Sequence, residues 1–479
     1  MNRGRTKRML CPMSSPKSFD YDAAIVGGGS AGYAAARTIA AAGLRAIVIE
    51  GGQEIGGLCI LRGCMPTKAL LHSAEVLYQA QHAEVFGVHA DGVRFDFARI
   101  MARKDRLIAE FAEYRTQQLQ SGLFKFVRAQ ARFADPHTIR LSSGETIRAR
   151  NIVLSTGSTV AAPPIAALKE TGYLTSDDAL KLDRLPRSLI VLGGGAVAIE
   201  FAQFFARLGV KVTVVQRSEQ ILRDMDTDAA QVLEAVLRRE GVTLFTKTQL
   251  LDAWREDGLK GVSFQHAGQV VRAAAEEILI GLGRVPKTEA LDLEAAGVAT
   301  KHGRIVTDAA MRTNVAHVYA AGDCTGLYEV VHLAVQQGEV AGHNIAYSEK
   351  PKHMDYRLLT AVVFSDPQLA TVGLTEKAAR GLGIPCLTAT NAFADHGKSL
   401  ILEARDGFVK LIADPVTGEI LGGGVAGPIG GELIHEVIAC MANGMTVHEL
   451  AALPHYHPTL AEIWTYPAEE LAARIPLAS

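Results

Sequence analysis

The stretch Ala24-Ile25-Val26-Gly27-Gly28-Gly29-Ser30-Ala31-Gly32 decides the fold of this chain. Its apolar start predicts a buried strand, and its glycines predict a tight turn into a helix that runs to Gly43. A second strand follows and ends at Glu50. A strand, a glycine-rich turn, a helix and a strand are the context that a dinucleotide-binding motif requires. The stretch therefore predicts an α/β unit that holds a nucleotide cofactor.

The chain contains a second copy of this pattern. Ile190-Val191-Leu192-Gly193-Gly194-Gly195-Ala196-Val197-Ala198 leads into a predicted helix to Gly209 and a strand that ends at Gln216. The spacing from the first glycine to the glycine after the helix is the same in both copies. One such match could arise by chance, whereas two in register predict two Rossmann-like nucleotide-binding domains.

The small residues of each copy have separate roles. The first makes the tight turn, the second lets a pyrophosphate approach the backbone, and the third allows the helix and strand to pack closely. The helix N-terminus then presents unpaired N–H groups and a favourable dipole to the phosphates. The expected cofactor-binding positions are Gly27, Gly29 and Gly32 in the first copy and Gly193, Gly195 and Ala198 in the second.

The ends of the second strands predict which nucleotide each copy binds. Glu50 suits the ribose hydroxyls of an adenosine, whereas its counterpart Gln216 is followed by Arg217 and Arg223. Loss of the carboxylate removes repulsion toward a 2′-phosphate, and each guanidinium could add a charge-assisted bond worth about 1.5–3 kcal/mol. We expect NADPH to be preferred, with NADH possible. The alternative is that both arginines are solvated surface charges.

Cys59 and Cys64 lie in the run Gly56-Gly57-Leu58-Cys59-Ile60-Leu61-Arg62-Gly63-Cys64-Met65-Pro66-Thr67-Lys68, shortly after the first copy. As a structural crosslink, so short a loop would contribute only about 2 kcal/mol. A regular helix would hold the two Cα atoms too far apart to bridge, so we expect Gly63 to loosen the turn. A short, weakly stabilising bond favours a redox-active disulfide over a structural one. The alternative is a pair of unrelated buried thiols.

Composition limits the class of protein. A chain of 479 residues suggests about three domains. A net charge of −2 gives no long-range attraction to nucleic acid or to an acidic membrane, and no apolar stretch is long enough to span a bilayer. Six scattered cysteines with one close pair favour a cytoplasmic protein over a secreted disulfide framework.

The first residues, Met1 to Ser18, are basic and lack the apolar core of a secretory signal. We expect a frayed tail, or a true start at Met9 or Met13. An organelle transit peptide is the alternative.

Taken together, the motifs resemble those of the FAD-dependent pyridine nucleotide–disulfide oxidoreductases, whose branches include dihydrolipoamide dehydrogenase, glutathione reductase and mercuric reductase. The resemblance begins near Asp20 and extends over nearly the whole remaining chain. It implies two Rossmann-like domains, one for FAD and one for NAD(P), and a C-terminal α+β dimerisation domain. The implied boundaries are an N-terminal tail at 1–20, a discontinuous FAD-binding domain at 21–160 and 282–355, an NAD(P)-binding domain at 161–281 and a dimerisation domain at 356–479.

The resemblance implies further FAD- and nucleotide-binding residues. Ser155-Thr156-Gly157-Ser158 is similar to the turn where the chain leaves the flavin domain, and Tyr319-Ala320-Ala321-Gly322-Asp323 is similar to the second FAD motif, in which Asp323 would hold a ribitol hydroxyl. Between the cysteine segment and the first of these motifs, residues from about 67 to 120 are expected to be helical. The further cofactor-binding residues are Gly57, Lys68, Thr156, Gly157 and Gly283.

The resemblance also implies the catalytic residues. After reduction Cys64 would be the thiolate near the flavin and Cys59 would exchange with the substrate, while Lys68 and Glu200 would form an ion pair beside the ring. His457 would be the acid–base catalyst, oriented by Glu462, and would act on the disulfide of the opposite subunit of a homodimer. Glu200 could instead be a carboxylate favoured by its helix dipole. No metal is expected, although His455 and His457 would share one face of a strand.

The predicted activity is electron transfer between NADPH, FAD, the Cys59–Cys64 disulfide and a small-molecule or carrier-borne disulfide, as in dihydrolipoamide dehydrogenase. The alternatives are a metal-ion reductase resembling mercuric reductase and a flavoprotein subunit that serves only a carrier protein. Mercury reduction itself is disfavoured because no cysteine follows Cys440. The role of Arg62, between the two cysteines, stays open: it could lower a thiolate pKa, favour an anionic substrate or point into solvent.

Overall fold

The computed structural model describes residues 18–476. The predicted N-terminal tail therefore lies almost entirely outside the described residues. The chain forms two compact units, each assembled from three separate segments. The first unit comprises Met1–Ile55, Gln117–Gly157 and Pro286–His353, and the second comprises Gly56–Thr116, Ser158–Val285 and Met354–Ser479.

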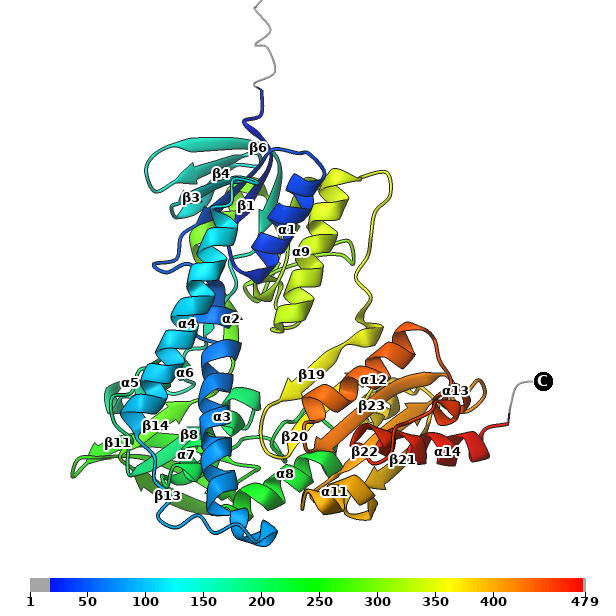
Figure 1. Cartoon of the computed structure of the whole chain (residues 1–479). Helices are drawn as coiled ribbons and strands as arrows, with labels where there is room; N and C mark the ends of the chain where they lie inside the picture. Colours follow the sequence, from blue (N-terminus) through cyan, green and yellow to red (C-terminus); the bar gives the residue numbers. More distant parts are fainter. Residues whose placement is uncertain (1–17, 477–479) are drawn as a thin grey trace, which may run out of the picture. The chain divides into compact units, whose positions relative to one another are not determined.

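A seven-stranded sheet forms the centre of the first unit (Figure 1). The strand predicted from Ala24 to Val26 lies within β1, which pairs in parallel with β2 on one side and β6 on the other. Both of its faces are covered, as is typical of a parallel α/β sheet. The strands are β1 (Tyr21–Val26), β2 (Ala46–Glu50), β3 (Lys125–Arg128), β4 (Ala131–Asp135), β5 (Thr138–Leu141), β6 (Thr146–Leu154) and β18 (Val318–Ala320).

Two helices of the first unit, α1 (Ser30–Ala41) and α9 (Val331–Ala346), run side by side (Figure 1). A Cβ atom at Gly338 would lie 2.2 Å from the carbonyl oxygen of Ala31, so only glycine allows this approach. The unit also contains η2 (Glu289–Leu291), η3 (Leu293–Ala296), β16 (Thr300–Lys301), β17 (Arg304–Ile305) and η4 (Asp323–Thr325).

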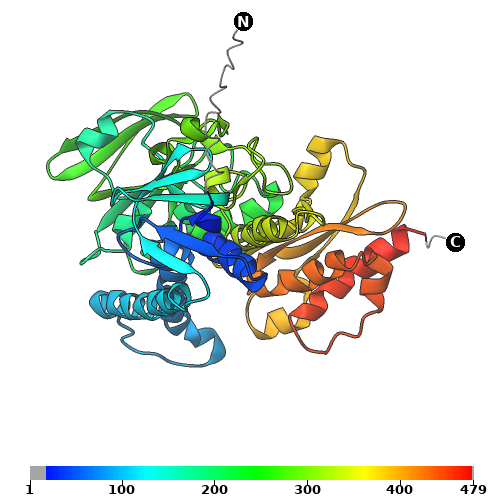
Figure 2. The same cartoon turned by 90° about the horizontal axis from the view of Figure 1, so that it is seen from above.

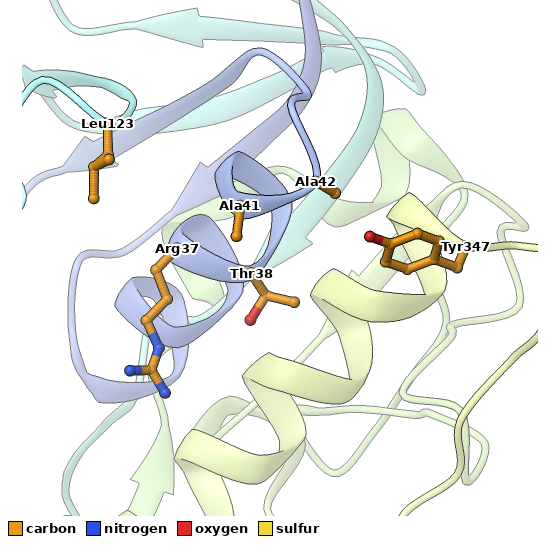
Figure 3. A pocket seen from close by; sticks show the side chains of 6 residues that line it. All are labelled: Arg37, Thr38, Ala41, Ala42, Leu123 and Tyr347. Carbon is orange, nitrogen blue, oxygen red and sulfur yellow. The ribbon is translucent and has the colours of Figure 1, made fainter.

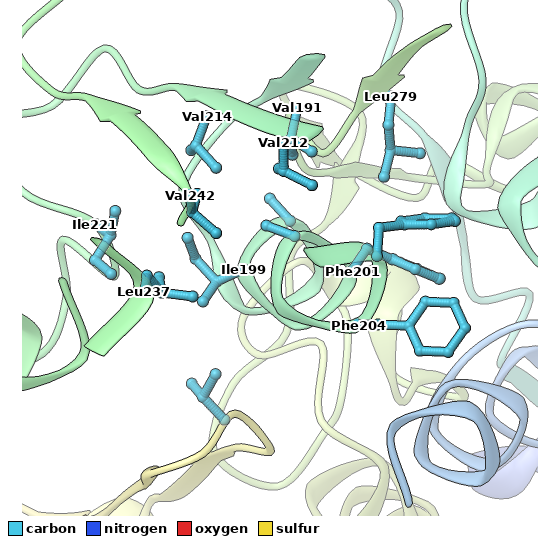
Figure 4. Close-up of a cluster of buried hydrophobic side chains, with 14 of the residues drawn as sticks. Val191, Ile199, Phe201, Phe204, Val212, Val214, Ile221, Leu237, Val242 and Leu279 are labelled. Atoms are coloured by element: carbon cyan, nitrogen blue, oxygen red, sulfur yellow. The ribbon is translucent and has the colours of Figure 1, made fainter. Parts of the chain in front are cut away.

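The second copy of the motif builds a four-stranded parallel sheet in the second unit. Its order is β10 (Thr243–Phe245), β9 (Lys211–Val215), β8 (Ser188–Leu192) and β14 (Glu277–Ile280). Helix α7 (Ala196–Arg207) packs on this sheet, and Figure 4 shows Ile199, Phe201 and Phe204 in the same cluster as valines of β8 and β9. The two Rossmann-like folds predicted from the sequence are thus confirmed.

The region after the cysteines differs from the single helical stretch predicted for residues 67–120. It forms two helices, α3 (Cys64–Gln81) and α4 (Phe97–Leu119), with η1 (Ala83–Phe86) and an irregular segment between them. Gly87 adopts a left-handed conformation directly after η1, which ends the helical path.

A five-stranded antiparallel sheet forms the C-terminal part of the second unit, in the order β19 (Thr360–Val363), β20 (Gln368–Gly373), β23 (Ile420–Gly427), β22 (Phe408–Ala413) and β21 (Leu387–Ala392). Helices α12 (Gly430–Ala442) and α14 (Thr465–Arg474) cover one face of this sheet (Figures 1 and 2). Alternate strand residues such as Ala370 and Val425 point into this core, whereas Leu369 and Ala426 pack on the opposite face. The predicted α+β character of this region is confirmed.

Shorter elements complete the second unit. They are α2 (Gly57–Leu61), β7 (Ser158–Val160), α5 (Ala167–Thr171), α6 (Ser176–Ala179), α8 (Thr227–Arg239), β11 (Gln249–Glu256), β12 (Leu259–His266), β13 (Gln269–Ala275), β15 (Arg284–Pro286), η5 (Tyr356–Leu358), α10 (Glu376–Leu382), η6 (Phe393–Asp395), α11 (Gly397–Ile401), α13 (Val447–Ala452) and η7 (Ala461–Trp464).

Candidate functional site

The two cysteines lie on either side of a helix break in the second unit. Cys59 belongs to α2 and Cys64 is the first residue of α3, so Arg62 and Gly63 separate the two helices. A Cβ atom at Gly63 would lie 3.0 Å from the carbonyl oxygen of Leu58, closer than side chains normally approach. Gly63 therefore permits the tight turn that the sequence predicted, and this turn brings the two sulfur atoms together.

The thiols of Cys59 and Cys64 are partly exposed and are not bonded to each other in the structure. A hydrogen bond from the Cys59 thiol and, to a smaller extent, the charge of Lys68 lower the pKa of Cys64 to about 7, against the opposing effect of burial. The same hydrogen bond, together with burial, raises the pKa of Cys59. The arrangement therefore stabilises one thiolate, at Cys64, and keeps the proton on Cys59.

Lys68 and Glu200 form an ion pair between α3 and α7, as the resemblance implied. The Nζ atom of Lys68 lies 3.0 Å from Oε1 and 2.8 Å from Oε2 of Glu200. The carboxylate is almost fully buried, and its Oε1 also accepts a hydrogen bond of 2.9 Å from the backbone N–H of Phe364. Lys68 further lies over the Phe364 ring, with 4.6 Å between Nζ and the ring centroid. Glu200 is thus more than a dipole-favoured helix residue, because it fixes the cation that lowers the pKa of Cys64.

Replacing Lys68 by Met should raise the pKa of Cys64 from about 7 toward its ordinary value near 9, because the cation that favours the thiolate is lost. Less of the thiolate would then be present at neutral pH, and more alkali would be needed to form it. The thiolate absorbance at 240 nm of the reduced holoenzyme, followed against pH, measures this change. Lys169→Met, at an exposed position of α5, is the control and should leave the curve in place. An unchanged curve for Lys68→Met would contradict the electrostatic role.

Arg62 does not simply extend into solvent. Its Nε atom lies 3.6 Å from a carboxylate oxygen of Asp177 on α6, and both side chains are about one-third exposed. Because it is already paired with a carboxylate, the guanidinium is a weaker candidate for binding an anionic substrate than the sequence suggested.

The first glycine-rich turn, in the first unit, has the close contacts that a dinucleotide cradle needs. A Cβ atom at Gly27 would lie 2.3 Å from the carbonyl oxygen of Ser155, and one at Gly32 would lie 1.9 Å from the carbonyl oxygen of Gly27. Gly29 is the N-cap of α1 and its side-chain-free surface leaves the helix N-terminus open. The Ser155 hydroxyl donates hydrogen bonds to the carbonyl oxygens of Val26 (3.1 Å) and Gly27 (2.9 Å), which joins β6 to the turn.

Glu50 and Thr156 complete this cradle within the first unit. The Glu50 carboxylate accepts hydrogen bonds from the backbone N–H groups of Gly28 (2.7 Å) and Gly52 (2.6 Å), so it is held at the end of β2. The hydroxyl of Thr156 is buried and has no hydrogen-bond partner. A buried hydroxyl without a partner fits a position that contacts a polar cofactor. The next residue, Gly157, has a left-handed backbone with φ of 72°.

Asp323 begins η4 in the same unit, directly after β18. The preceding residue, Gly322, donates its backbone N–H to the side-chain oxygen of Gln337 on α9 at 2.7 Å. Gln337 is completely buried, so this bond fixes the turn that presents Asp323.

The second glycine-rich turn, in the second unit, repeats the first. A Cβ atom at Gly193 would lie 2.4 Å from the carbonyl oxygen of Gly281, and one at Gly281 would lie 2.7 Å from the Cβ atom of Ala198. Ala198 therefore fills the third small position without separating helix from strand. At Gly195, the N-cap of α7, an added Cβ atom would meet nothing within 4 Å, so the phosphate-binding end of the helix is open.

The two arginines proposed to select the nucleotide are both exposed. Arg217 follows β9, and its backbone N–H donates to the side chain of Gln216 at 3.1 Å. The Nε atom of Arg223 lies 3.4 Å from the carboxylate of Asp224. Gly283, the remaining residue of this group, accepts a backbone hydrogen bond from Ala161 at 3.1 Å.

His457 lies in the irregular segment between α13 and η7, and Nδ1 of its ring is 3.0 Å from Oε2 of Glu462. The imidazole is 78% exposed whereas the Glu462 side chain is 11% exposed, so the ring extends outward from a buried anchor. His455 pairs separately with Glu436 on α12 at 2.6 Å. Residues 455–457 are not a strand, so the expectation that the two histidines share a strand face is wrong: Pro454 and Pro458 flank them and exclude regular pairing.

Three further features of the described residues bear on function. Within residues 18–476, no group of three or more His, Cys, Asp or Glu side chains is arranged to hold a metal ion. No helix in that range is both long and apolar enough to cross a membrane. A surface hollow of about 540 Å³ lies beside α1 in the first unit, lined by Arg37, Thr38, Ala41, Ala42, Leu123 and Tyr347 (Figure 3), and none of these is a predicted site residue.

Sequence reasoning missed Phe364, Gln337 and Ser155, which support the candidate residues through single hydrogen bonds. It also missed His396, which lies next to Glu462. No local spacing could have indicated these residues, because each is far along the chain from its partner. Only Ser155 belonged to a motif that the sequence singled out.

Comparison with known proteins identifies the family to which this chain belongs. Residues 21–338 match the family model described as pyridine nucleotide-disulphide oxidoreductase, and residues 359–468 match the model of its dimerisation domain. The chain is 32% identical to dihydrolipoyl dehydrogenase of Bacillus subtilis over 92% of this chain and 96% of that protein.

Two solved structures are also similar. LpdA from Mycobacterium tuberculosis has 30% identity and a TM-score of 0.85. The Cu(II) complex of the HOCl-induced flavoprotein disulfide reductase RclA from Escherichia coli has 28% identity and a TM-score of 0.84. Both alignments cover 94% of this chain and 99% of the other. With the two nucleotide folds and the paired thiols, these similarities establish that this chain belongs to the pyridine nucleotide-disulphide oxidoreductases, and that it is an FAD-dependent NAD(P)H disulfide oxidoreductase.

Proposed function

We propose that this enzyme transfers electrons between NADPH and a disulfide substrate through the Cys59–Cys64 pair, in the manner of a dihydrolipoyl dehydrogenase. The single observation that carries the proposal is the asymmetric thiol pair: Cys64 has a pKa of about 7 beside Lys68, and Cys59 keeps its proton. One thiol is thereby prepared as the electron-rich partner and the other as the exchanging group.

The residues proposed to hold FAD and the nicotinamide dinucleotide are of the kinds that bind such cofactors: glycines in tight turns, polar side chains and an open helix N-terminus. In the first unit, Gly27, Gly29, Gly32, Glu50, Thr156, Gly157 and Asp323 would bind FAD, and in the second unit Gly57 and Lys68 would do so. The open end of α7, with Gly193, Gly195, Ala198 and Gly283, would bind the dinucleotide. When bound, FAD supplies the two-electron carrier between the nicotinamide and the disulfide. The domain boundaries inferred from the sequence stay a proposal. The compact units divide the chain differently, because residues 56–116 of the proposed FAD-binding domain belong to the second unit with the proposed NAD(P)-binding and dimerisation domains.

The chain's own residues would then carry out thiol–disulfide exchange. Two electrons and one proton convert the Cys59–Cys64 disulfide into the Cys64 thiolate and the Cys59 thiol. His457 removes the proton of Cys59, the Cys59 sulfur attacks the substrate disulfide, and the leaving thiolate takes that proton back from His457. The Cys64 thiolate attacks the Cys59 sulfur in the mixed disulfide, which restores the Cys59–Cys64 bond and releases the second substrate thiolate.

We propose a homodimer in which His457 serves the cysteine pair of the other subunit. The dimerisation domain supports a dimer, and the exposed ring of His457 on its buried Glu462 anchor suits a group that acts beyond its own chain. The scattered cysteines favour a cytoplasmic setting.

The nucleotide preference is tested by the two exposed arginines. In the double variant Arg217→Met, Arg223→Met, kcat/KM for NADPH should fall about a hundredfold to ten-thousandfold, because two charge-assisted bonds to the 2′-phosphate, each worth about 1.5–3 kcal/mol, are lost. The value for NADH, which lacks that phosphate, should stay unchanged. Arg187→Met, at an almost fully exposed position before β8, is the control and should affect neither. A wild-type enzyme that clearly prefers NADH would contradict the assignment.

The substrate class is tested by steady-state assay of the holoenzyme with lipoamide, glutathione disulfide and a thioredoxin-like protein. Turnover of lipoamide supports the dihydrolipoyl dehydrogenase type. A metal-ion reductase is the second candidate, favoured by the similarity to a flavoprotein disulfide reductase solved with Cu(II). NADPH oxidation driven by Cu(II), and by none of the disulfides, would favour that candidate.

A further inference from the structure

One buried histidine of the second unit is not used by this mechanism. His396 lies between η6 and α11 and is completely buried. A fully buried imidazole normally needs a partner for both ring nitrogens, since an unsatisfied polar group is costly in a protein interior. Nδ1 of His396 has a hydrogen-bonding partner in Ser399, whereas Nε2 makes no well-aligned hydrogen bond and lies within ion-pair distance of Glu462.

The contacts form a continuous chain from Ser399 to the exposed ring of His457. Nδ1 of His396 lies 2.8 Å from the hydroxyl oxygen of Ser399, and Nε2 lies 3.3 Å from Oε1 of Glu462. The other carboxylate oxygen, Oε2, is 3.0 Å from Nδ1 of His457. Glu462 therefore has one oxygen toward each imidazole.

The charge state of Glu462 determines how the protons are arranged. A carboxylate only accepts hydrogen bonds, so Nδ1 of His457 must carry a proton, and at 3.3 Å the same carboxylate favours the tautomer of His396 with its proton on Nε2. Nδ1 of His396 then accepts from the Ser399 hydroxyl. In His457, the same arrangement leaves Nε2 as the free base, which is the atom that can take a proton from a thiol.

We propose that His396 is a positioning residue that holds Glu462 in the orientation that selects the reactive tautomer of His457. This inference rests on the acid–base role proposed above for His457. Without the N–H of His396, the Oε1 atom of this largely buried carboxylate would lose that contact, and Glu462 would be free to turn away from His457.

The surroundings of His396 favour its neutral form. Burial lowers its pKa and the positive charge of His457 acts in the same direction, while Glu462 opposes both. From α14, the Tyr466 ring meets His396 edge-on, with 6.2 Å between ring centroids. From α11, the nearest polar group is the uncharged Ser399. His396 is therefore neutral at pH 7 and becomes a second cation beside Glu462 only in acid, where it would compete with His457 for the carboxylate.

A matched pair of variants separates the two contacts of this ring. In His396→Gln the amide N–H can reach the place of Nε2 and keep the bond to Glu462. In His396→Asn the shorter amide replaces Nδ1, so it keeps Ser399 but loses Glu462. Each NADPH-reduced holoenzyme is treated with iodoacetamide between pH 5.5 and 9, and alkylation of Cys59 is followed by mass spectrometry. His457→Gln serves as the reference for loss of the base.

We expect His457→Gln to slow alkylation of Cys59 near neutral pH and to move the inflection of its pH profile upward. His396→Asn should shift the profile in the same direction and slow alkylation about tenfold to a hundredfold, the range seen when a partner that orients an imidazole is removed. In His396→Gln the alkylation rate should stay within about threefold of the wild-type rate. A general loss of packing would instead slow the Asn and Gln variants alike. Flavin reduction by NADPH should be the same in all four proteins.

The results distinguish a wrong role for His457 from a wrong role for His396. If His457→Gln leaves the profile unchanged, the proposed base role of His457 is wrong and the inference falls with it. If His457→Gln shifts the profile but His396→Asn does not, or if the Asn and Gln variants shift it equally, only the role of His396 is wrong. Should His396→Asn fail to fold, Ser399→Ala replaces it. That change removes the donor to Nδ1, so it should shift the profile in the same direction, and an unchanged profile would overturn the proposal.

Discussion

Cys59→Ser enzyme is expected to accept electrons from NADPH and yet to reduce no disulfide. A serine hydroxyl can still donate a hydrogen bond to Cys64, so the thiolate beside Lys68 persists, but oxygen cannot form the mixed disulfide with the substrate. Turnover should fall by about a thousandfold or more, as is usual when a covalent nucleophile is removed. Rapid mixing with NADPH, followed at 450 nm, measures flavin reduction, and product thiol measures turnover.

The control for this prediction is another cysteine. Cys386 is partly exposed and lies before β21, with no partner in the thiol pair, so Cys386→Ser should retain full activity. If Cys59→Ser still reduced the disulfide substrate, Cys59 could not be the thiol that attacks it. A parallel loss of flavin reduction would instead show that the substitution damaged the cofactor site.

His457→Ala should slow reoxidation of the reduced enzyme by a disulfide about a hundredfold to ten-thousandfold, the usual contribution of general acid–base catalysis. Flavin reduction by NADPH should remain largely intact, because the predicted role of His457 concerns only the proton exchanged with Cys59 and the leaving thiol. Glu462→Ala should show the same separation, since it removes the carboxylate that orients the ring at 3.0 Å. Stopped-flow measurement of the two half-reactions tests both variants.

His89→Ala is a suitable control, because His89 is exposed in the irregular segment between α3 and α4. It should leave both half-reactions unchanged. Equal slowing of flavin reduction and reoxidation in His457→Ala would contradict the acid–base role and point to a structural defect.

Short sequence motifs accounted for much of what could be predicted about this protein. The glycine-rich turns at Gly27 and Gly193 were predictable because a Cβ atom at either position would lie within 2.5 Å of a carbonyl oxygen. This requirement for glycine is visible in a few adjacent residues. The thiol pair was predictable for the same reason, since Cys59, Gly63 and Cys64 act over a single turn. The helical stretch expected for residues 67–120 is helical in large part, but its division into α3 and α4 was not predicted, because a composition typical of helix does not show where a chain folds back.

What the sequence by itself determined is therefore the two nucleotide folds and the family, together with the neighbouring positions of Cys59 and Cys64. The tertiary structure alone decided which partners tune that chemistry. Lys68 meets Glu200 across 132 residues, Glu200 meets Phe364 across 164, and His396 reaches Glu462 from the turn before α11. The physical reason is that helical and turn geometry constrains only neighbouring residues, whereas contacts between distant segments depend on the packing of whole cores.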